Sequence, residues 1–272
     1  MIWLPTALLY FFLFAFGAAL GSFINVVIYR TIKGQSWVKG FSKCDHCGKH
    51  LRWYDNIPLL SFLFLRGKSR DCGQPLSFIH PVIEATTGLL LVSWYWLGQS
   101  YFQLDGAFAY LQPAFWLAVG LLLLMIVIAD YLYMIIPDGL VAVLLGLTLL
   151  YRLSLVMVGV MPLSELIASV IVTAVIFSFF AGLWLMTGGR GMGLGDVKLV
   201  LPLGLLLGWP QAVLGIFLAF ILGAIISLLL LAVHKKRFGQ TIPFGPFLVL
   251  GAVIALVAGN ELIGWYLALM GL

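Results

Sequence analysis

The sequence predicts an all-α polytopic membrane protein, with about eight transmembrane helices and a small cytosolic loop domain that contains cysteines. Of its 272 residues, 63% are hydrophobic and only 9% are charged, and the mean hydropathy is +1.12. Soluble domains are roughly half apolar and about a quarter charged, so this composition excludes a soluble globular domain, a disordered chain and a disulfide-rich scaffold. The apolar residues also come in blocks of about 20, the length that crosses a bilayer.

Eight apolar segments are expected to span the membrane in turn. They cover residues 4–28, 80–98, 110–133, 139–158, 164–186, 197–209, 212–233 and 245–270. The sixth is short, because Asp196 precedes it and the Trp209-Pro210 pair ends it. We expect it to tilt, to thin the bilayer or to cross only in part. Seven crossings are the alternative count.

Basic residues are concentrated in one polar loop, which sets the orientation. Nine of the fifteen Lys and Arg residues lie in residues 30–70. Since cytosolic loops collect Lys and Arg, this loop is expected in the cytosol, together with the loops at 134–138, 187–196 and 234–244. Later cytosolic charges are Arg190, Lys198, Lys235, Lys236 and Arg237. Arg152 is an exception near the outer end of its span. Topology and contact with anionic lipid explain the net charge of +5 without a nucleic-acid partner.

Three segments follow from this topology: a first transmembrane helix at 1–29, a cytosolic cysteine loop domain at 30–79 and a transmembrane core at 80–272. Residues 1–29 contain no basic residue that could form the n-region of a signal peptide, so the first apolar block is expected to remain as a span. A loop unit of this size rarely holds a core without a metal, disulfides or a partner surface.

Two of the ten acidic residues occupy special positions. Asp130 ends the third apolar block, just ahead of the Ile136-Pro137-Asp138 turn, and so lies at the cytosolic end of its span. Asp196 ends a Gly-Leu-Gly-Asp string and opens the sixth span, and the charge count puts it at the same membrane face. Acidic side chains in spans are costly and usually functional. The glycines before Asp196 allow a partner helix to come close.

Two carboxylates that meet at a partly dehydrated site are expected to share one proton and to titrate as a unit. One carboxylate then activates a water molecule, while the protonated one polarises the scissile carbonyl and assists departure of the amine. The predicted reaction is therefore peptide hydrolysis, with Asp130 and Asp196 as the catalytic pair. The alternative is that each aspartate only caps the first turn of a helix.

The three cysteines form one complete knuckle and part of another. Cys44 and Cys47 make a Cys-x-x-Cys knuckle, and the segment from Ser69 to Cys72 has the same shape with serine in the first position. Four thiolates would indicate zinc strongly, whereas three thiolates and a serine leave bound zinc and free thiols as alternatives. A cytosolic loop argues against a disulfide. The fourth ligand would come from His46, His50 or water.

Other motifs follow in a fixed order along the chain. They are residues 21–30 (GSFINVVIYR), the two knuckles, 55–58 (DNIP), 81–84 (PVIE), Asp130 ahead of 136–138 (IPD), 193–198 (GLGDVK) and 243–246 (PFGP). Each string is loose when taken alone, but together they resemble the type IV prepilin peptidases over nearly the whole chain. The sequence departs from the four-cysteine pattern of that family at Ser69, which bears on metal binding and methylation and not on cleavage.

The resemblance implies a multi-pass aspartic peptidase of the bacterial inner membrane, with residues 80–272 as its peptidase core. It implies removal of the short basic leader of type IV pilin-like precursors by a cut after glycine on the cytosolic side. The catalytic pair again falls on Asp130 and Asp196, with Gly193 and Gly195 in the Gly-x-Gly-Asp motif. Whether pili, type II secretion or DNA uptake is served stays open. Acidic partners for the leader would be Asp45, Asp55, Asp71 or Glu84.

The resemblance also implies N-methylation of the newly exposed residue, with S-adenosylmethionine as the methyl donor. In such enzymes the cysteine loop is tied to zinc and to methylation. No residue is assigned to the donor, because Gly17 to Gly21 lies in a span and lacks the strand–turn–helix context of a nucleotide loop.

Three rival functions remain for comparison. An ion-coupled transporter would also use intramembrane aspartates, but it would place them near the bilayer midplane within paired broken helices. A membrane scaffold would use the acids only as caps. A metallopeptidase is disfavoured because the sequence contains no His-Glu-x-x-His string.

Overall fold

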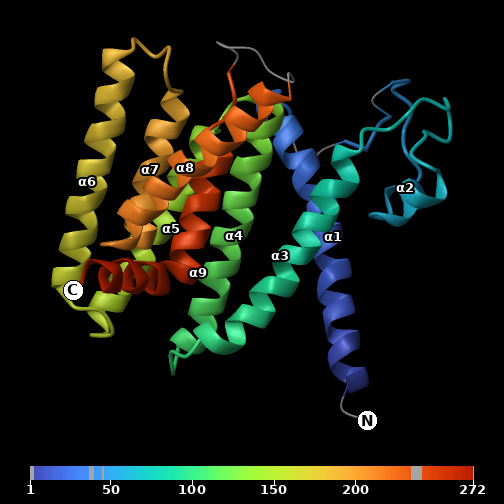
Figure 1. Cartoon of the computed structure of the whole chain (residues 1–272). Coiled ribbons are helices and arrows are strands. Elements are labelled where there is room, and N and C mark those ends of the chain that lie inside the picture. The colour runs from blue at the N-terminus through green and yellow to red at the C-terminus, as the bar shows by residue number, and fades with distance from the viewer. Residues whose placement is uncertain (1–2, 37–39, 45, 234–240, 272) are drawn as a thin grey trace. The chain divides into compact units, whose positions relative to one another are not determined.

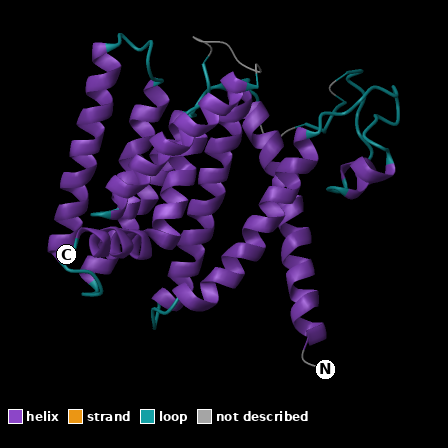
Figure 2. Ribbon diagram, viewed as in Figure 1, coloured by secondary structure: helices purple, strands orange, loops and turns teal. Residues whose placement is uncertain are grey.

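The computed structural model describes residues 3–36, 40–44, 46–233 and 241–271, and it is helical over nearly all of the expected spans (Figures 1 and 2). Within the described residues there are two isolated β-bridges and no β-strand. The elements are α1 (Trp3–Ile32), η1 (Trp53–Asn56), α2 (Leu60–Phe64), α3 (Ile79–Tyr101), α4 (Phe108–Tyr133), α5 (Asp138–Met157), α6 (Leu163–Met186), α7 (Leu194–Leu207), α8 (Gln211–Ala232) and α9 (Gly245–Met270).

Each of the eight expected spans corresponds to one helix, which confirms the predicted all-α membrane fold. Six described helices are long and apolar enough to cross a bilayer: α1, α4, α5, α6, α8 and α9. Helices α3 and α7 complete the predicted eight. Helix α7 has only 14 residues, about 21 Å of length, against a hydrocarbon core of about 30 Å. The expected residues Asp45, Lys235, Lys236 and Arg237 lie outside the described part of the chain.

The chain divides into two compact units, residues 1–125 and 126–272. This division does not test the predicted organisation into 1–29, 30–79 and 80–272, which stays a prediction. In the first unit, α1 and α3 pack side by side (Figure 1). A Cβ atom added to Gly17 would lie 2.7 Å from Cα of Gly88, and one added to Gly21 would lie 2.8 Å from Oγ1 of Thr87. These glycines let the two backbones approach closely.

In the second unit, α7 is the central helix, because it contacts α5, α6, α8 and α9. Its residues Leu199 and Val200 are fully buried. At its C-terminal end, Arg152 of α5 donates hydrogen bonds to the hydroxyl of Ser169 and to the carbonyl oxygen of Leu206. A cation at this position stabilises the free carbonyls of a helix C-terminus. Arg152, the one basic residue that departs from the expected excess of positive charge on the cytosolic side, therefore anchors α7.

Candidate active site and cysteine centre

Asp130 lies in the last turns of α4, and only 6% of it is exposed. The backbone N–H of Gly245 donates a hydrogen bond of 2.9 Å to its Oδ2 atom. Gly245 is the first residue of α9 and is followed by Pro246. The N–H groups of a first helical turn have no partner within the helix, and the helix dipole favours negative charge there. The carboxylate of Asp130 is thus held at the N-terminus of α9.

Asp196 lies in the first turn of α7 and is 7% exposed. Its carboxyl group interacts with the backbone of Gly193, the residue that precedes the helix. Among the described residues, none hydrogen-bonds to its Oδ1 atom, although this atom is buried. Buried polar atoms nearly always have a partner in native proteins. The Oδ1 atom of Asp196 is thus a buried acceptor without a hydrogen-bond partner among the described residues.

The structure brings the two aspartates together at one end of the second unit. Asp130 is close enough to Asp196 for its charge to act on that carboxyl group. Ile136, in the turn after α4, joins the two helix starts. A Cβ atom added to Gly195 would lie 3.0 Å from Ile136, and one added to Gly245 would lie 3.2 Å from it. Ile136 therefore packs against both glycines, and the missing side chains let α7 and α9 converge on the aspartates.

Asp138, the neighbouring acid in the Ile-Pro-Asp turn, forms an ion pair away from the two buried aspartates. Its carboxylate accepts hydrogen bonds from Nζ of Lys198 at 2.8 and 2.9 Å. The side chain of Asp138 is 72% exposed, in contrast to the two buried aspartates. This ion pair joins the first residue of α5 to the second turn of α7.

The cysteine loop folds as two matching knuckles. In the first, the N–H of Cys44 donates to the carbonyl of Lys49 at 2.9 Å; in the second, the N–H of Ser69 donates to the carbonyl of Gln74 at 2.8 Å. Isolated β-bridges close each knuckle at equivalent places. Ser69 therefore occupies the position of Cys44 in the second knuckle, as the sequence pattern predicts.

The sulfur atoms of Cys44, Cys47 and Cys72 all lie within 4.8 Å of one another. The Sγ atoms of Cys44 and Cys72 are 3.8 Å apart, and two thiolates on a tetrahedral zinc ion are separated by about 3.8 Å. The hydroxyl of Ser69 lies 3.4 Å from Sγ of Cys44. The three sulfur atoms are therefore compatible with a zinc site, and the hydroxyl of Ser69 lies beside one of them. His46, an expected fourth ligand, hydrogen-bonds instead to the carbonyl of Pro75.

Cys44 is suited to act as a thiolate. Its hydrogen bond with Ser69, together with backbone hydrogen bonds from Cys47 and His46, lowers the pKa of the Cys44 thiol to about 6. A thiol with a lowered pKa is deprotonated at neutral pH, which is the form that binds a metal.

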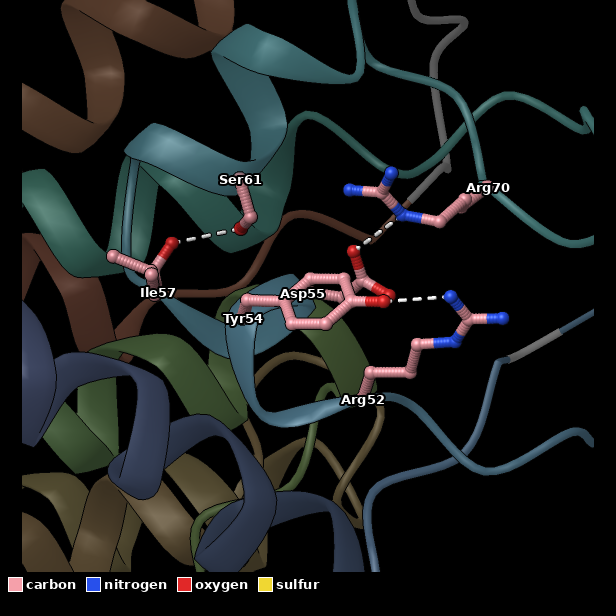
Figure 3. Close-up of polar contacts among 6 residues, drawn as sticks. All are labelled: Arg52, Tyr54, Asp55, Ile57, Ser61 and Arg70. Atoms are coloured by element: carbon pink, nitrogen blue, oxygen red, sulfur yellow. Dashed lines mark hydrogen bonds and ion pairs between the residues drawn. The ribbon is translucent and has the colours of Figure 1, made fainter.

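Two of the acids expected to meet a basic leader have partners within the chain. Asp55 accepts a hydrogen bond of 2.9 Å from Nε of Arg70 (Figure 3). Oε2 of Glu84 accepts one of 2.8 Å from the backbone N–H of Leu59. The remaining described candidate, Asp71, is exposed and acts through its charge on Arg52.

Sequence reasoning assigned no role to Gly245 or Ile136, which complete the aspartate site. Both lie in short motifs, Pro-Phe-Gly-Pro and Ile-Pro-Asp. The sequence did contain one signal for this helix start. Gly245 is followed by Pro246, and proline is favoured in the first turn of a helix.

Two family models match the chain. The bacterial peptidase A24 N-terminal domain matches residues 15–97, and the type IV leader peptidase family matches residues 116–228. The prepilin leader peptidase/N-methyltransferase of Aeromonas hydrophila is 32% identical over 95% of this chain and 94% of its own length. The chain belongs to the type IV leader peptidase family.

Further relatives carry the same name. The prepilin leader peptidase/N-methyltransferase of Klebsiella pneumoniae is 38% identical over 75% of this chain and 88% of its own length. That of Pseudomonas aeruginosa is 32% identical over 94% and 92%. No solved structure gives a significant match. Membership of the leader peptidase family makes the chain a peptidase and disfavours the transporter reading.

Proposed function

We propose that this leader peptidase cleaves the short basic leader of type IV prepilin-like precursors after a glycine, with Asp130 and Asp196 as its catalytic pair. One observation carries the assignment of residues. Two buried aspartates, from helices far apart in the sequence, lie where the starts of α7 and α9 converge on Ile136. The names of the relatives supply the substrate class.

The surroundings of the two aspartates favour different roles in hydrolysis. Asp130 accepts a hydrogen bond from a helix N-terminus, which favours its negative charge, so it acts as the base that takes a proton from water. Asp196 has a buried oxygen without a partner among the described residues, and we assign it the second role, in which its protonated form donates to the scissile carbonyl oxygen. As the peptide bond breaks, Asp130 returns its proton to the nitrogen of the leaving amine, and Asp196 recovers its proton from the hydroxyl of the tetrahedral intermediate.

The enzyme is proposed to lie in the bacterial inner membrane with this site at the cytosolic face. The helices establish a membrane protein, and the cytosolic assignment rests on the basic loop at residues 30–70. The substrate therefore meets the enzyme from the cytosol, before its export to pili or secretion machinery.

Methyl transfer is proposed for the chain as a whole, because the relatives are named N-methyltransferases. S-adenosylmethionine would supply the methyl group. The glycines at 17 and 21 are used in packing against α3 and do not form a nucleotide loop. Incubation of the purified protein with a pilin-type precursor and this donor tests both activities. Mass spectrometry should show a precursor that has lost its leader and gained one methyl group at the new N-terminus.

We propose that Cys44, Cys47 and Cys72 hold a zinc ion that joins the two knuckles. The Ser69→Cys exchange is then expected to tighten zinc binding on the order of tenfold or more, because it completes a four-thiolate set. The measurement is the concentration of a coloured chelator that removes zinc from the purified protein. Gln74→Cys is the matched control, since it adds a thiol to the same knuckle outside the cluster. Equal zinc retention in the two variants would contradict the assignment.

The Asp138→Asn exchange is expected to leave cleavage within about fivefold of the wild-type rate. It breaks an exposed ion pair with Lys198, and such pairs contribute about 0–1 kcal/mol. Initial rates of precursor cleavage measure the effect. A loss as complete as that of Asp130→Asn would place Asp138 in the catalytic site and overturn the assignment.

A further inference from the structure

The loop domain carries an exposed apolar surface on α2. Leu60, Leu63 and Phe64 are spaced so that they share one side of the helix, and they are 50%, 69% and 81% exposed. We call these three residues the α2 face. Large apolar side chains gathered on a surface indicate contact with a membrane or with another protein.

The contacts of α2 fix the direction of this face. The ring of Phe62 packs against that of Phe78, with the ring centroids 5.6 Å apart. The hydroxyl of Ser61 donates a hydrogen bond of 2.7 Å to the carbonyl of Ile57 at the start of the helix (Figure 3). The α2 face is therefore a defined feature of the loop domain.

A hydrogen bond holds the residue before α2 beside the N-terminal part of α3. The N–H of Leu59 donates to Glu84 at 2.8 Å, and α3 begins at Ile79. At 1.5 Å per residue, Glu84 lies about 7–8 Å along α3 from its first residue. Apolar faces of interfacial helices lie about 5–10 Å deep, at the boundary between headgroups and acyl chains. Leu59, the residue before α2, is therefore held beside α3 at a distance from the first residue of that helix that is comparable with this depth.

The charges beside α2 suit the same environment. Arg66 and Lys68 follow the helix directly, and Arg52 precedes it; all three are exposed. Long basic side chains beside an apolar face extend to lipid phosphates while their stems stay in the apolar layer. The chain enters the loop from α1 and leaves it into α3, so both of its ends are held at the membrane.

We propose that the α2 face docks the cysteine domain on the lipid bilayer, in the leaflet at the C-terminal end of α1. In this proposal lipid covers the α2 face, and neither a second copy of the chain nor a protein partner does. Docking keeps the cysteine cluster at a fixed height beside the membrane. The inference goes beyond the proposed peptidase function and is independent of it.

Site-directed spin labelling tests the docking without any assay of activity. A spin-labelled noncanonical amino acid replaces Phe64 in the full-length protein in nanodiscs of mixed anionic and zwitterionic lipid. The matched control carries the label at Gln74, an exposed position on the second knuckle. The label at 64 is expected to be relaxed several-fold more by oxygen than by a water-soluble nickel chelate, and the label at 74 the reverse.

Two outcomes would overturn the proposal. Equal access of the nickel chelate to both positions would mean that the α2 face lies in water, and shielding of position 64 from both reagents would mean that protein covers it. A second variant, Leu60→Ser with Leu63→Ser and the label at 64, is expected to shift that label toward nickel access. An unchanged profile in this variant would show that the α2 face does not cause the docking.

Discussion

Asp130→Asn and Asp196→Asn are each expected to abolish cleavage of a pilin-type precursor while the protein stays folded. Asparagine keeps the size of the side chain but removes the ionisable group, so neither proton transfer of the proposed mechanism can occur. Loss of one member of a catalytic unit costs on the order of 10⁴-fold or more in rate. Purified variants in detergent are compared by mass analysis of the leader, with circular dichroism and size-exclusion chromatography as the checks on folding.

The double variant sharpens this comparison, because groups that act as a unit give strongly non-additive losses. The residual cleavage rate of the double variant should equal that of either single variant within the sensitivity of the assay. Asp138→Asn is the matched control: it makes the same chemical change eight positions along the chain, at an acid paired with Lys198. Normal cleavage in either single variant would remove that aspartate from the proposed pair and would favour the capping role.

The helix positions could be predicted because hydrophobic length is the dominant signal in a membrane protein. The first span was expected at 4–28, and α1 runs from Trp3 to Ile32. Its extra turn carries Tyr29 and Arg30, because a helix continues through the polar boundary where apolar residues end. The shared knuckle shape was predicted for a different reason: the Cys-x-x-Cys spacing fixes the local turn.

The surroundings of the aspartates could not be predicted in the same way. Charge counting put Asp130 and Asp196 at one membrane face, but every residue except proline has a backbone N–H, so the sequence did not show that Gly245 would be the donor to Asp130. Arg152 shows the same limit, since its partners Ser169 and Leu206 belong to two other helices. Pairings between helices depend on three-dimensional packing, which periodicity does not report.

Gly245 is a positioning residue for Asp130 in the proposed mechanism, and its missing side chain is what the site requires. A Cβ atom built at Gly245 would lie 2.6 Å from Oδ2 of Asp130 and 3.2 Å from Ile136. Real Cβ atoms almost never approach a neighbour within 3.0 Å, so the carboxylate, the turn at Ile136 or the start of α9 must move. Overpacking of this kind costs about 1–3 kcal/mol of stability.

Gly245→Ala is therefore expected to lower kcat for precursor cleavage on the order of 100-fold, the cost of a catalytic group misplaced by about 1 Å. The KM should stay near that of the wild type, because Gly245 contacts Asp130 and is not proposed to touch the leader. Alanine retains the N–H donor, so the loss reports displacement of the carboxylate and not loss of the hydrogen bond. Gly264→Ala is the matched control in the same helix, where an added Cβ meets nothing within 4 Å. Equal kcat values for the two variants would show that the start of α9 does not position Asp130.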